Sequence, residues 1–100
     1  MSTLKLFAIH DQKAAAFLQP FFSRTISTAV REVTEVVNDP QHAFSKYSAD
    51  YTLYAVGEFE EFTGVLTSYS ESRLVGNLVE FKTQSGDPLP IPAFLKRQAD

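Results

Sequence analysis

Apolar and polar residues alternate along several stretches of the chain, which is the period of a β-strand. Residues 3–10 show this alternation and carry apolar groups on both faces toward their end, so they predict a central strand. The same period predicts strands over 51–59 and 65–70, and a shorter apolar stretch predicts one over 21–24. Because Gly64 lies between two of these strands and tolerates a positive φ, we expect a hairpin there.

The apolar spacing changes to three and four residues between Ile26 and Val37, which predicts an amphipathic helix over 26–37. Thr25 or Ser27 can cap its start, and Asn38-Asp39-Pro40 ends it because proline cannot continue the hydrogen-bond ladder. Four of its residues are valines, which have weak helix propensity. Packing of the valine stripe on the sheet must therefore supply most of the stability of this helix.

The segments between these elements give weaker patterns. Residues 14–18 are compatible with a helical turn, whereas Pro20 biases Gln19 toward extended backbone. Residues 41–50 have no sustained period and many small polar side chains, so we expect a loop.

Two further elements are expected after Ser70. Leu74, Leu78 and Phe81 follow a helical spacing that predicts a short second helix despite Gly76. Three prolines follow within residues 85–100, and this composition predicts an extended, Pro-rich C-terminal tail.

Together these patterns predict an α+β fold. We expect a small antiparallel β-sheet of three or four strands packed against one main α-helix, with a second short C-terminal helix and the extended Pro-rich tail. Residues 1–84 would form a single domain, and residues 85–100 the tail. The length of 100 residues and an apolar content of 44% are sufficient for one modest core.

Composition excludes several classes of protein. The chain has no cysteine, which rules out disulfides, thiolate zinc sites and cysteine nucleophiles and suits a reducing compartment. No apolar run approaches the roughly 18 residues of a membrane span, and the first residues lack the pattern of a signal peptide. We therefore expect neither a membrane protein nor a secreted one.

The net charge of −3 is unevenly distributed along the sequence. Residues 1–31 hold four Lys or Arg and one Asp, residues 32–62 hold seven Asp or Glu and one Lys, and the remainder is balanced. An acidic total argues against strong nonspecific binding of nucleic acid. The basic first third is the one segment that could contact phosphates.

Catalytic chemistry has little support in the sequence. His10 and Asp11 are adjacent in a strand, so their side chains point to opposite faces, and we expect the strand to end there with Asp11 starting a turn. His42 stands alone in a polar segment. The three glutamates near position 60 flank a turn and are best explained as solvated. With two histidines, no cysteine and no nucleotide-binding or hydrolase motif, we expect no enzyme activity, no metal and no cofactor.

Aromatic residues interleaved with basic ones are typical of proteins that bind single-stranded nucleic acid, because bases stack on rings while cations meet phosphates. Most phenylalanines are needed for the core, namely Phe7, Phe21, Phe44 and Phe59. The rings that we expect to be exposed are Phe22, Tyr47, Tyr54 and Tyr69. The candidate nucleic-acid-binding residues are Lys5, Lys13, Phe22, Arg24, Arg31 and Tyr54.

Several motifs also occur in a known order and spacing. They are KLFAIHDQKA at 5–14, PFF at 20–22, VNDPQHAFSK at 37–46, DYTLY at 50–54, GEF at 57–59, TG at 63–64 and LVEFK at 78–82. In these motifs the chain resembles the small non-structural, DNA-binding-labelled protein of gokushovirus-type microviruses. The resemblance implies a bacteriophage protein that works in the host bacterial cytoplasm and assists synthesis of the single-stranded DNA genome.

Two hypotheses of function follow. In the first, the protein is a replication accessory that binds single-stranded DNA, with at most four phosphate contacts per chain from Lys5, Lys13, Arg24 and Arg31. In the second, it is a non-enzymatic module that docks on the replication initiator or the host replisome. A small sheet without prolines or inward lysines at its edges also predicts a homodimer formed by strand pairing.

Overall fold

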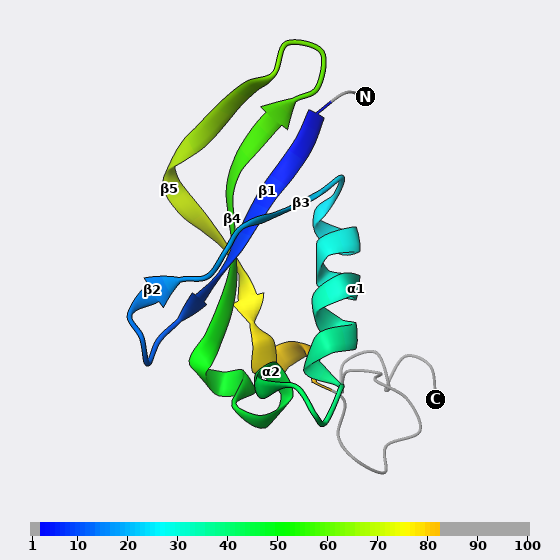
Figure 1. Ribbon diagram of the computed structural model, residues 1–100, viewed down its shortest axis with the longest axis vertical. Coiled ribbons are helices and arrows are strands. Elements are labelled where there is room, and N and C mark those ends of the chain that lie inside the picture. Colours follow the sequence, from blue (N-terminus) through cyan, green and yellow to red (C-terminus); the bar gives the residue numbers. More distant parts are fainter. Residues whose placement is uncertain (1–2, 83–100) are drawn as a thin grey trace, which may run out of the picture.

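The computed structural model describes residues 3–82 and shows one antiparallel sheet with a single long helix on one side of it (Figure 1). The chain order is β1 (Thr3–Asp11), β2 (Ala16–Phe17), β3 (Phe21–Ser23), α1 (Ile26–Val37), α2 (Ala43–Lys46), the 3-10 helix η1 (Ser48–Asp50), β4 (Tyr51–Glu60), β5 (Val65–Asn77) and the 3-10 helix η2 (Leu78–Phe81). Strands account for 46% of the described residues.

The sheet has five strands in the order β2-β1-β4-β5, and β3 also pairs with β1. β1 is therefore bonded to β4 on one side and to the two short strands β2 and β3 on the other. The pairing shifts register between Ala55 and Gly57, so Val56 has no direct partner on either neighbour. Such bulges bend strands, and the sheet curls into a half-barrel.

The prediction of the main helix is confirmed, since α1 spans the expected residues. Its N-cap is Thr25, whose Oγ1 accepts a hydrogen bond from the Thr28 backbone N–H at 3.0 Å. The stripe of Ala29, Val33 and Val37 is buried against the sheet. The core that it completes consists of Phe7, Ile9, Ala29, Val33, Val37, Leu53, Ala55 and Leu78.

The segment expected as a loop over 41–50 is instead partly helical, as α2 and η1. Nδ1 of His42 accepts a hydrogen bond from the Phe44 backbone N–H at 3.0 Å and so caps the start of α2. These turns are too short to show a hydrophobic period, and local caps rather than periodicity specify them.

The predicted second helix after Ser70 is wrong, because β5 continues to Asn77 and only η2 follows it. The register of β5 against β4 passes from Leu74 to Gly76, leaving Val75 as an extra residue. An inserted residue changes an apolar spacing of two into one of three or four, which imitates a helix. Asn77 and Glu80 then form a capping box at the start of η2.

The predicted α+β fold class needs the same correction. The described chain is mostly β, a curled half-barrel with one main helix, rather than a sheet of three or four strands with two helices. The predicted Pro-rich tail lies outside the described residues, as does the proposed domain boundary at residue 84. Within residues 3–82 no helix has the length and apolar character needed to cross a membrane.

Candidate nucleic-acid interface

The two faces of the sheet differ in what covers them. Residues that pair directly on neighbouring strands share a face of the sheet. The pair Ile9 and Leu53 lies in the core beneath α1, whereas the adjacent pair Ala8 and Tyr54 lies on the other face. We call this second surface the open face. It carries Leu4, Leu6, His10, Phe17, Phe22, Tyr54, Phe59, Leu66 and Leu74.

Several apolar side chains of the open face are exposed to solvent. Phe17 is 48% exposed, Phe22 49%, Leu66 58% and Leu74 69%. An apolar surface of this kind, contributed by five strands of one sheet, is typical of a binding site rather than of an ordinary protein surface.

The aromatic rings of the open face form two clusters. In the first, the ring centroid of Phe17 lies 4.8 Å from that of His10 and 5.6 Å from that of Tyr54, in both cases edge to face. In the second, the rings of Phe22 and Phe59 are 5.6 Å apart. Each cluster therefore holds one half-exposed phenylalanine against less exposed rings, which fixes its orientation.

A tight turn positions Phe17 and explains why the sequence pattern missed it. Oδ1 of Asp11 accepts hydrogen bonds from the backbone N–H groups of Lys13 and Ala14, at 3.0 and 3.3 Å, and Ala15 has a φ of +55°. The chain thereby reverses and pairs Phe17 with His10. The turn at Asp11 was expected, but residues 14–18 were interpreted as compatible with a helical turn, so the strand that carries Phe17 was not predicted.

The structure brings two of the six predicted site residues, Phe22 and Tyr54, to the open face. The four predicted cations do not share a surface. Lys13 lies in the turn beside the Phe17 cluster, whereas Lys5 pairs in register with Glu58 on the opposite face. Arg31 is exposed on α1, on the covered side of the sheet.

Arg24 is engaged by an acidic partner. Its two terminal nitrogens donate to the two carboxylate oxygens of Glu61 at 3.1 Å each, a bidentate pair between β3's end and the β4–β5 turn. A phosphate would have to compete with this carboxylate for the guanidinium.

Tyr69, expected as an exposed ring, is instead fixed by its neighbours. Its hydroxyl donates to Oε2 of Glu58 at 2.9 Å, and the guanidinium of Arg73 lies 3.6 Å from its ring centroid. Burial, together with the hydrogen bond and charge of Glu58, raises the pKa of Tyr69 above 10.0. This tyrosine is neutral at physiological pH. Tyr47, by contrast, is 59% exposed as expected, but it follows α2.

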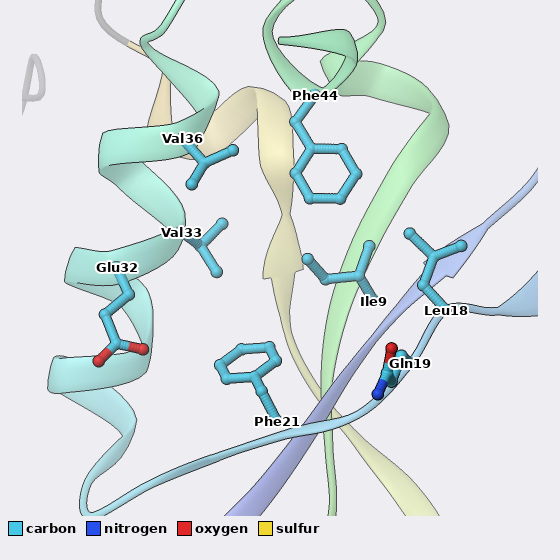
Figure 2. A pocket seen from close by; sticks show the side chains of 8 residues that line it. All are labelled: Ile9, Leu18, Gln19, Phe21, Glu32, Val33, Val36 and Phe44. Atoms are coloured by element: carbon cyan, nitrogen blue, oxygen red, sulfur yellow. The ribbon is translucent and has the colours of Figure 1, made fainter.

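A groove lies on the covered side of the sheet, between α1 and the segment leading into β3 (Figure 2). We call it the α1 groove. It encloses about 340 Å³ and is lined by Ile9, Leu18, Gln19, Phe21, Glu32, Val33, Val36 and Phe44. Figure 2 shows apolar side chains from the helix and the sheet facing one another across it. Among the described lining residues, Glu32 alone is charged.

Neither surface has the chemistry of a metal centre. Across residues 3–82 there is no group of three or more His, Asp or Glu side chains placed to hold an ion. The open face offers rings and apolar side chains for contact.

Comparison with known proteins identifies the family of the chain. A model of the family described as Phage ORF5 protein matches residues 4–81, which is nearly all of the described structure. Among the curated proteins and the solved structures no match was found. The chain belongs to the Phage ORF5 protein family.

Proposed function

We propose that this phage protein is an accessory of viral DNA replication that binds single-stranded DNA on the open face. The observation that carries the proposal is the pair of aromatic clusters on one surface of the sheet, the surface that α1 does not cover. The resemblance to the gokushovirus-type non-structural protein supports the same role. The host bacterial cytoplasm, where the phage genome is copied, is the expected site of action.

Base stacking is the physical basis of the proposed binding. Every base has a π-face, and stacking on an aromatic side chain contributes about 1–3 kcal/mol per base without requiring a particular sequence. The partners of Phe22 and Phe17 on β1 are Leu6 and His10, four residues apart. At about 3.4 Å per residue the two clusters are separated by roughly 14 Å, so one DNA strand can contact both.

Charge contributes little to this mode of binding. Among the cations predicted from the sequence, Lys13 alone lies beside the open face, and the net charge is −3. Each phosphate contact with a single strand changes the logarithm of affinity by about 0.7 per decade of salt. We therefore expect a salt slope near −0.7 per chain, shallower than the limit of about −3 implied by four contacts.

The proposal is tested by fluorescence anisotropy with a labelled oligothymidylate. Phe17→Ala and Phe22→Ala each remove one half-exposed ring, and we expect each to weaken binding by about 5- to 150-fold. Tyr47→Ala is the matched control, because it removes a ring of similar exposure away from the open face and should leave affinity unchanged. Equal affinities for all three variants would contradict the proposal.

A second candidate function, docking on the replication initiator or the host replisome, is supported by the α1 groove. Its apolar walls and the Glu32 carboxylate complement a peptide in which apolar side chains precede basic ones. A labelled Trp-Leu-Lys-Arg peptide provides the test. Glu32→Lys should abolish its binding and Glu35→Lys, on the same helix but outside the groove, should not.

A further inference from the structure

The two edges of the sheet are protected very differently. One edge is made by β2 and β3, with two and three residues respectively, and short strands of this kind offer little backbone for pairing. The other edge is β5, which has 13 residues and, within residues 3–82, pairs with β4 alone. In the described part of the chain, the longest stretch of strand backbone with no strand beside it therefore runs along the free side of β5 (Figure 1).

Within β5, residues 65–68 form the most regular part of this edge. They pair with residues 57–60 of β4 without a register shift. Shifts occur beyond them, and Glu71 and Arg73 follow, so bulges and charges protect the later part of the strand. Residues 65–68 themselves contain no charge and no proline.

Apolar side chains collect at the same place. Val65 is 54% exposed and Leu66 58% exposed, and Phe62 in the adjoining turn is 88% exposed. Because the segment is uncharged, two identical copies can lie side by side without like-charge repulsion. The Val65 N–H already donates to Oγ1 of Thr63 at 3.3 Å. The edge thus offers the backbone of residues 66–68 for pairing, apolar contacts and no electrostatic barrier toward its own copy.

We propose that a second copy of this chain pairs antiparallel along residues 65–68 and joins the two sheets into one across a two-fold axis. Such an interface is isologous, since the same segment serves on both sides. Four residues per strand bury little area, so we expect dissociation in the micromolar range.

The geometry of this dimer bears on the open face. A two-fold axis that relates antiparallel neighbours runs perpendicular to the sheet, so both open faces lie on the same side of the joined sheet. Two sets of aromatic clusters would then be presented together. The inference itself depends only on the edge and does not rest on DNA binding.

Sedimentation velocity of the unliganded protein over 1–200 µM tests the inference. The wild type should pass from the 11.2 kDa of one chain toward twice that mass as its concentration rises. Leu66→Lys places a positive charge in the paired segment of both chains. The two charges repel each other across the interface, so the dissociation constant of the dimer should rise at least tenfold.

Leu74→Lys is the matched control. It makes the same change on the same strand at a more exposed leucine, beyond the register shifts, and should dimerise like the wild type. Circular dichroism confirms that both variants fold. A wild type that stays monomeric at 200 µM, or equal dissociation constants for Leu66→Lys and Leu74→Lys, would overturn the proposed interface, and neither outcome would bear on DNA binding.

Discussion

At the scale of single residues, Gly57 shows how one position controls the curvature of the sheet. A Cβ built on it would lie 2.5 Å from the backbone oxygen of Thr67 on β5, which is closer than real Cβ contacts allow. Gly57 also adjoins the bulge at Val56. Glycine is required there because only a residue without a side chain permits the two strands to approach.

We expect Gly57→Ala to lower the free energy of unfolding by about 1–3 kcal/mol, because the backbone of β5 must shift to admit the methyl group. Gly76→Ala is the comparison, since its added Cβ would meet the end of the flexible Phe81 side chain at 3.0 Å. Urea denaturation measures both. A cost for Gly57→Ala no larger than that for Gly76→Ala would contradict this role of Gly57.

The raised pKa of Tyr69 leads to a prediction about pH. A tyrosine whose pKa is higher in the folded state than in the unfolded chain contributes stability that is fully present below pH 10.0 and is lost as pH rises through the folded value. We therefore expect stability to fall above pH 10, and to fall less steeply in Tyr69→Phe. Thermal melts at several alkaline pH values check this, and parallel declines for both proteins would count against it.

At the scale of elements, a helix or strand could be predicted where its apolar residues follow the period of its backbone without interruption. The helix over 26–37 was predicted correctly because it has an uninterrupted stripe, a threonine cap and a proline stop. β5 was cut short because extra residues at its bulges break the period of two. A turn was correctly expected at Asp11, but β2 after it was missed because two residues are too few to show a hydrophobic period.

The valine stripe of α1 gives the prediction at this scale. Val33 is 5% exposed and packs in the core, so Val33→Asp buries an unpaired carboxylate. We expect a cost of several kcal/mol, comparable to the whole stability of a small domain, and a strongly lowered melting temperature. Arg31→Asp, which also introduces an aspartate but on the exposed side of the helix, should melt near the wild type. Unchanged melting of Val33→Asp would contradict the packing of α1.

At the scale of the whole molecule, the candidate interface depends on which residues the topology brings together. Phe22 is exposed as the sequence predicted, whereas Tyr54, also predicted to be exposed, is partly buried. Phe17, His10 and the two exposed leucines join these rings only through strand pairing. The basic first third of the sequence does not become a basic face. Its cations are divided between a turn, an ion pair, a strand and a helix.

In the proposed function, the rings rather than the cations are therefore responsible for binding single-stranded DNA. The most direct measurement is the affinity for a labelled oligothymidylate at low salt of two double variants, Phe17→Ala/Phe22→Ala and Lys13→Glu/Arg24→Glu. We predict a large loss of affinity in the first and a loss of only a few-fold in the second, because one of its two cations lies beside the open face. The reverse order, or no binding by the wild type, would contradict the account.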